Sequence, residues 1–171
     1  MSTTTMKKIC SIFIGAVTAP AAGQWIDLPA SNEEIQSIID EIQRTECEEY
    51  IISDYEGLLN VNEFSNPFEL NDQAAEIEGL DNEQQTVIEC LMSEAGYSFS
   101  EALDQVTSGD YRIYEDCHDM TDVAYMVADE MGYLENVPDN VARYFDYEAF
   151  GRDLGFEGQF YYSDIGYVEV W

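Results

Sequence analysis

The chain has 171 residues, of which 36 are Asp or Glu and only 6 are Lys or Arg, so its formal net charge at pH 7 is -30. This length allows one to three small compact units and excludes a large enzyme with separate cofactor and substrate domains. The charge excludes nucleic acid and anionic membranes as natural partners, because both repel a negative surface. Hydrophobic residues make up 46% and aromatic residues 13%, so we expect a folded core and a basic macromolecular partner.

Three strands are expected in the first 64 residues. Residues 9–14 are apolar on nearly both faces, as in a central strand. Because Lys7 and Lys8 precede this apolar run, the segment taken alone also matches a secretory signal, and both interpretations stay open at this point. A second strand is predicted over residues 24–28, closed by the proline that follows, and a third over residues 50–55.

An amphipathic helix is predicted between the second and third strands. Ser31 and Glu34 have the spacing of a capping box. The apolar positions follow the i, i+3, i+4, i+7 pattern of one helix face, and they are Ile35, Ile38, Ile39 and Ile42. Glu33, Asp40 and Glu41 point away from that stripe, so the outer helix face should be a row of carboxylates.

The middle segment, residues 65–109, is expected to be all-helical. Asn66-Pro67, Gly79 and Gly96 separate short helical patterns, and Ser98 with Glu101 forms a second capping box. Every charged residue in this segment is acidic: Glu69, Asp72, Glu76, Glu78, Asp81, Glu83, Glu89, Glu94, Glu101 and Asp104. The acidity is therefore distributed along the chain and is not confined to a tail.

The last segment, residues 110–171, begins with a predicted strand over residues 111–115 and an amphipathic helix. The apolar stripe of that helix consists of Val123, Met126 and Val127. Gly132 is placed to end the helix, and Pro138 can begin a further short one.

A final helix and a hairpin complete the predicted elements. Asp146 should cap a helix that runs through Leu154 and stops at Gly155, and residues 156–171 should form a hairpin that turns near residues 163–166. Together the elements predict an α+β chain in three parts: a small α+β unit over residues 1–64, a helical unit over residues 65–109 and an α+β unit over residues 110–171.

Most catalytic chemistries lack the residues they need. No lysine follows Lys8, which removes a phosphate-binding loop of the Walker type, and His118 is the single histidine. Residues 115–119 superficially resemble a metal-ligand cluster, but neighbours in a strand-to-helix connection seldom converge on one ion. We therefore expect no enzyme, no catalytic residues, no cofactor and no metal site, and a helix-capping acidic turn near Asp119.

The four cysteines, Cys10, Cys47, Cys90 and Cys117, contain no C-x-x-C pair. Four free thiols in a cytoplasmic protein are the favoured interpretation, with two disulfides in an exported protein as the alternative.

Two runs near the C-terminus carry a family resemblance. They are residues 116–124 (DCHDMTDVA) and 144–154 (YFDYEAFGRDL), and residues 24–29 (QWIDLP) and 53–56 (SDYE) add to them near the N-terminus. With these motifs the chain resembles the ArdA family of antirestriction proteins carried by conjugative elements. The chain departs from the family pattern at residues 15–20, where the family usually has a loop with Gly, Asn and Tyr. The resemblance favours the strand interpretation of residues 9–14.

The resemblance implies an elongated three-part monomer that pairs through its last part into a homodimer. It also implies a mimic of B-DNA that occupies the DNA-binding groove of a type I restriction-modification enzyme, formed by its methyltransferase core and specificity subunit. Asp116, Asp119 and Met120 are the candidates for the dimer seam. The candidate phosphate-mimicking carboxylates are Asp40, Glu41, Glu76, Glu78, Asp81, Glu83, Glu89, Glu94, Glu101, Asp104, Asp122, Asp129 and Glu130.

Two other hypotheses account for the same acidity. One is an acidic chaperone or scaffold for basic nucleic-acid-binding proteins. The other is a salt-adapted protein of unrelated function, whose carboxylates serve solvation.

Overall fold

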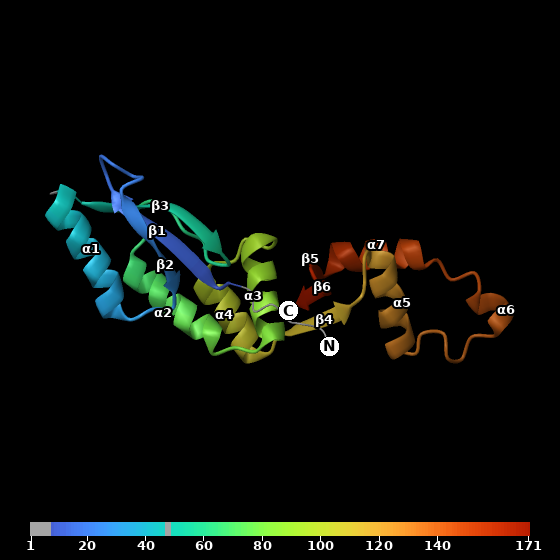
Figure 1. Cartoon of the computed structure of the whole chain (residues 1–171). Coiled ribbons are helices and arrows are strands. Elements are labelled where there is room, and N and C mark those ends of the chain that lie inside the picture. Colours follow the sequence, from blue (N-terminus) through green and yellow to red (C-terminus); the bar gives the residue numbers. More distant parts are fainter. Residues whose placement is uncertain (1–7, 47–48) are drawn as a thin grey trace, which may run out of the picture. The chain divides into compact units, whose positions relative to one another are not determined.

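The computed structural model describes residues 8–46 and 49–171. Over these residues it contains seven helices and two three-stranded sheets, so the predicted α+β class is confirmed. The chain divides into two compact units, Met1–Asp81 and Asn82–Trp171, whose elements are labelled in Figure 1. The three predicted parts, with boundaries after residues 64 and 109, remain a prediction.

The first unit is built on a sheet with strand order β2-β1-β3. The central strand β1 (Cys10–Ala16) pairs antiparallel with β2 (Gly23–Leu28) and with β3 (Tyr50–Gly57). The strand interpretation of the first apolar run is therefore confirmed. β3 continues two residues beyond its predicted end, because its pairing with β1 extends to the pair between Gly57 and Cys10.

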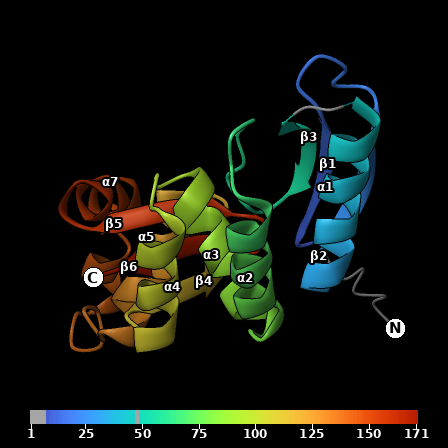
Figure 2. The same ribbon diagram turned by 90° about the vertical axis from the view of Figure 1, so that its left-hand side faces the viewer.

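Helix α1 (Asn32–Glu46) covers one face of this sheet, as Figure 2 shows. The predicted capping box is present: Ser31 Oγ accepts from the Glu34 backbone N–H, and the Glu34 carboxylate accepts from the Ser31 backbone N–H at 3.0 Å. Ile12 and Ile14 of β1 and Ile35 of α1 are fully buried. Burial of this apolar face stabilises the unit.

Helix α2 (Pro67–Glu78) closes the first unit, with Asn66 as its N-cap. The amide of Asn71, which is buried, donates to the carbonyl of Ala30 at 2.9 Å and accepts from its N–H at 2.7 Å. This pair of bonds holds α2 against the segment that leads into α1.

The second unit begins with two helices, α3 (Asn82–Ser93) and α4 (Phe99–Ser108), and continues as a mixed segment. Its further elements are β4 (Tyr111–Glu115), α5 (Met120–Glu130), α6 (Asp139–Ala142), α7 (Tyr147–Glu157), β5 (Gln159–Ser163) and β6 (Gly166–Val170). The sheet order is β4-β6-β5, with antiparallel pairing throughout. The predicted helical middle segment, the Ser98–Glu101 capping box and the turn before Gly166 are confirmed.

The predicted end of the last helix was wrong. α7 continues through Gly155 to Glu157, and the hairpin strand β5 consequently begins at Gln159. Neither glycine of α7 ends the helix, and Gly151 serves helix packing. A Cβ on Gly151 would lie 2.7 Å from the carbonyl carbon of Met120, so only glycine allows α7 to approach the start of α5 this closely.

Cys10, Cys90 and Cys117 are buried and free, which confirms the free-thiol interpretation for these three residues. Cys47 lies outside the described residues. Within residues 8–46 and 49–171, no helix is both long enough and apolar enough to cross a membrane.

Candidate functional site

The carboxylates form the most extensive chemical feature of the surface. Among the described residues, no Asp or Glu side chain is buried. Glu89, Asp122 and Glu169 are half-buried, and the other described carboxylates are exposed. The core is made almost entirely of apolar side chains, so the described carboxylates face solvent or a partner.

All the predicted phosphate-mimicking residues lie on helices or at helix ends. They lie on α1, α2, α3, α4 and α5, except Asp81, which lies between α2 and α3, and Glu94, which directly follows α3. Glu89 and Asp122 are half-buried and the other members are exposed. These groups are therefore accessible to a partner, and they are divided between the two units.

Several of these carboxylates already serve the fold. Glu101 completes the capping box of α4, and its pKa is lowered by its hydrogen bonds from the Ser98 side chain and backbone. Asp122 accepts from the His118 backbone N–H at 2.9 Å, and Glu83 accepts from the Tyr111 hydroxyl at 3.1 Å. These groups are less free to rotate toward a partner than a solvated carboxylate.

A second group of carboxylates has no such role. Within the described part of the chain, no hydrogen bond or ion pair engages the side chains of Glu41, Glu76, Glu78, Asp104 and Asp129. Because their charges are not compensated by the fold, these five residues are the best placed of the predicted set to meet cations of a partner.

Lys8, Arg112 and Arg152 form ion pairs with acids of the chain itself. The Arg112 guanidinium pairs with Glu130 and lies 4.7 Å from the centre of the Tyr114 ring. The Tyr114 hydroxyl donates to Glu169 at 2.8 Å, and burial together with this carboxylate raises the pKa of Tyr114. Glu130 is therefore neutralised within the second unit, which makes it the weakest member of the predicted mimic set.

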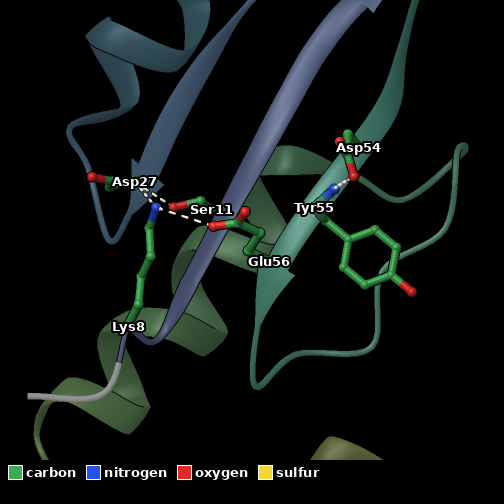
Figure 3. A network of polar contacts seen from close by, with 6 residues as sticks. All are labelled: Lys8, Ser11, Asp27, Asp54, Tyr55 and Glu56. Atoms are coloured by element: carbon green, nitrogen blue, oxygen red, sulfur yellow. Dashed lines mark hydrogen bonds and ion pairs between the residues drawn. The ribbon is translucent and has the colours of Figure 1, made fainter.

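A similar arrangement holds the first sheet together, as Figure 3 shows. Lys8 Nζ lies 3.0 Å from Asp27 Oδ1 on β2 and 3.7 Å from Glu56 Oε2 on β3, and Ser11 of β1 donates to Asp27. The Ser11 hydroxyl and the Lys8 ammonium lower the pKa of Asp27, in that order of effect. One ammonium group thus bridges the two outer strands across the central one.

The connection at residues 115–119 is an acidic turn, as predicted. Asp119 caps α5 by accepting from the backbone N–H groups of Thr121 and Asp122, and Asp116 has a left-handed φ of 58°. Cys117 is buried, and burial raises the pKa of its thiol. Of the residues that the structure describes, no three His, Cys, Asp or Glu side chains are grouped so as to hold a metal ion.

The three candidates for a dimer seam lie at the start of α5. Asp116 and Asp119 are exposed, and Met120 is partly buried against the core of the second unit. Met120 also contacts the glycine face of α7, so part of its apolar surface is already used within the chain.

A set of aromatic side chains on the acidic surface was not predicted from the sequence. Trp25 is 42% exposed, and Tyr125 stacks on Tyr147 with 3.7 Å between the ring centroids. Tyr144 and Phe156 are more than four-fifths exposed. A signal for Trp25 was present, because it shares one strand face with Asp27, whereas Ile26 and Leu28 lie on the other face.

The fold and surface define a class of protein: a folded α+β chain whose carboxylates face outward and whose expected partner is a basic surface. A comparison with family models shows which member of this class it is. The chain matches the family described as antirestriction protein (ArdA) over residues 18–169, and it belongs to that family. A search of curated proteins found no match. As a member of an antirestriction family, the protein acts against restriction enzymes.

Proposed function

We propose that this antirestriction protein mimics the phosphate surface of B-DNA and inhibits type I restriction-modification enzymes by occupying their DNA-binding groove. The observation that carries the proposal is the absence of any buried Asp or Glu among the described residues, in a chain with a net charge of -30. A duplex carries one negative charge per about 1.7 Å, so this net charge equals that of roughly 50 Å, or about 15 base pairs, of DNA.

The spacing of carboxylates on a helix supports the same proposal. On α2, Glu69, Asp72 and Glu76 follow at i, i+3 and i+7, so successive carboxylates on this face rise about 5 Å along the axis. One strand of DNA has a phosphate every ~3.4 Å of axis. Arg and Lys side chains that line a DNA groove are long enough to accommodate this difference, and carboxylates accept the same paired N–H bonds as phosphates.

Inhibition by this route needs occupancy and no chemistry. In this mechanism the groove of the methyltransferase core and specificity subunit closes on carboxylates, and DNA is excluded while the protein is bound. The protein would act in the cytoplasm, where the restriction enzyme meets incoming DNA.

We further propose that the chain acts as a homodimer paired through residues 110–171, with Asp116, Asp119 and Met120 at the seam. The exposed aromatic side chains of this segment support the pairing, because they provide apolar surface that would otherwise remain in water. Light scattering over a range of protein concentrations should give the mass of two chains. The mass of one chain at all concentrations would contradict the pairing.

The test of inhibition is DNA cleavage by a type I restriction enzyme at a fixed concentration of this protein and increasing concentrations of DNA. Competition for the groove predicts inhibition that weakens as DNA rises. Inhibition that is independent of DNA concentration, or absent across several type I enzymes, would refute the mimic and favour an acidic chaperone.

A further inference from the structure

The outer face of the first sheet, which is the face opposite α1, combines aromatic and acidic side chains. The strand registers place these residues in two rows, each with one side chain from β2, β1 and β3. The polar row is Asp27, Ser11 and Glu56, and the aromatic row is Trp25, Phe13 and Asp54. These six residues are called here the outer sheet face, and Figure 3 shows its polar row and Asp54.

The aromatic row presents a fixed platform. The rings of Phe13 and Trp25 meet edge to face, with centroids 5.6 Å apart and an interplanar angle of 72°. Phe13 is half-buried, whereas Trp25 is 42% exposed. Because the strand and the neighbouring ring already hold Trp25, a partner that covers it would lose little conformational entropy. Such rigid, half-exposed tryptophans are common energetic centres of interfaces.

The polar row already holds a cation. Lys8 lies over it, with its ammonium 3.0 Å from Asp27 and 3.7 Å from Glu56. Asp54, in the aromatic row, accepts from the Tyr55 backbone N–H at 2.9 Å and remains exposed. The face therefore binds one cation of the chain and keeps a further carboxylate beside the aromatic pair.

We propose that the outer sheet face docks arginine side chains of the restriction enzyme's DNA-binding groove, with one guanidinium stacked on Trp25 and a second paired with Asp54. This inference rests on the proposed function and deepens it. Asp27 is two residues from Trp25 on the same strand, about 7 Å away, and Asp54 is two strands across, about 10 Å away. Because Asp27 already pairs with Lys8 and Ser11, a segment with two arginines would stack one guanidinium on the indole ring and pair the other with Asp54.

Charge and geometry select this occupant over the others. A second copy of the chain would place Asp27, Asp54 and Glu56 against like charges, and nucleic acid would be repelled in the same way. An apolar partner would strip water from the carboxylates without compensating them. Arginine is favoured over lysine because its planar guanidinium stacks on aromatic rings and pairs with a carboxylate through two N–H bonds.

The first test uses a blocked peptide of alternating arginine and glycine, with a lysine peptide of equal length and charge for comparison. The chain has two tryptophans, so Trp171→Phe leaves Trp25 as the only tryptophan fluorophore. We expect the arginine peptide to shift the Trp25 emission saturably and to bind about fivefold or more tightly than the lysine peptide. An unchanged emission, or equal binding of both peptides, would overturn the proposal.

Matched variants separate this face from the general acidity of the chain, with peptide affinity measured by calorimetry. Trp25→Ala should weaken arginine-peptide binding by about tenfold or more, and Asp54→Asn by roughly threefold to fivefold. The controls are Trp171→Ala and Asp139→Asn, which make the same changes at exposed positions of the second unit that are not part of the outer sheet face, and should have smaller effects. Thermal unfolding of each variant checks the fold. If Trp25→Ala does not fold, Asp54→Asn and the Trp25 emission still decide the question.

The same variants in the DNA cleavage assay distinguish the failure of this inference from the failure of the proposed function. If the unaltered protein does not inhibit a type I enzyme, the proposed function fails. If it inhibits, and Trp25→Ala and Asp54→Asn inhibit as well as Trp171→Ala and Asp139→Asn, the docking inference alone is wrong. Loss of inhibition confined to the Trp25 and Asp54 variants would support it.

Discussion

Replacing Gly151 by alanine should destabilise the second unit, whereas the same replacement at Gly155, one turn further along α7, should not. A Cβ on Gly151 would lie 2.7 Å from the carbonyl carbon and 3.1 Å from the next backbone nitrogen at the start of α5. These are backbone atoms, so the two helices must move apart. A Cβ on Gly155 would meet only Met120 side-chain atoms, at 3.7 Å and 3.8 Å, which is ordinary contact.

The magnitude follows from the core that the two helices share. Val123 and Val127 of α5 pack with Phe150 and Leu154 of α7. Overpacking of such a contact costs about 1–3 kcal/mol, and the gain in helix propensity from Gly to Ala offsets up to about 1 kcal/mol. We therefore expect Gly151→Ala to lower the free energy of unfolding by about 1–2 kcal/mol, and Gly155→Ala to leave it unchanged or raise it by up to about 1 kcal/mol.

Thermal unfolding followed by circular dichroism measures both variants. For a unit of this size, the loss corresponds to a transition lower by about 5–15 °C for Gly151→Ala. Equal stability of Gly151→Ala and the unaltered protein would show that the close approach of α7 to α5 does not exist in solution. A loss at Gly155 as large as that at Gly151 would show that α7 ends where the sequence pattern predicted.

Three further predictions concern the carboxylates and caps. Glu83→Gln should weaken inhibition of a type I enzyme by less than about fivefold, because one exposed ion pair is worth about 1 kcal/mol or less. Neutralising Glu76, Glu78 and Asp104 together should weaken inhibition cumulatively. Complete loss of inhibition by folded Glu83→Gln would contradict a distributed binding surface. Ser98→Ala should lower the free energy of unfolding, measured by urea titration, by about 1 kcal/mol, because the N-cap of α4 is lost. An unchanged urea midpoint would refute the capping role of Ser98. Because the folded-state pKa of Glu101 is lowered, its contribution to folding stability is present above its unfolded pKa of about 4.3 and is lost as pH falls through the folded pKa. The difference in free energy of unfolding between the unaltered protein and Glu101→Gln should therefore shrink between about pH 5 and pH 3. A difference that does not change with pH would contradict this role of Glu101.

Local signals predicted most of the elements. The capping boxes at Ser31 and Ser98 and the N-caps at Asp119 and Asp146 were all found where the sequence placed them, because a cap depends on residues three or fewer positions apart. The acidic surface was equally predictable in kind. Charged groups stay in water unless they are paired, so a chain with so few cations must expose nearly all its carboxylates.

The sequence by itself therefore determined the class of fold, the acidic surface and the family. Tertiary structure decided which carboxylates are compensated: Glu130 by Arg112, and Asp27 by Ser11 and Lys8, through contacts between residues far apart in the chain. It also decided that Gly155 continues a helix and that Trp25 lies in a row with Phe13 and Asp54. Such facts depend on packing between elements and on strand register, which local residue patterns do not encode.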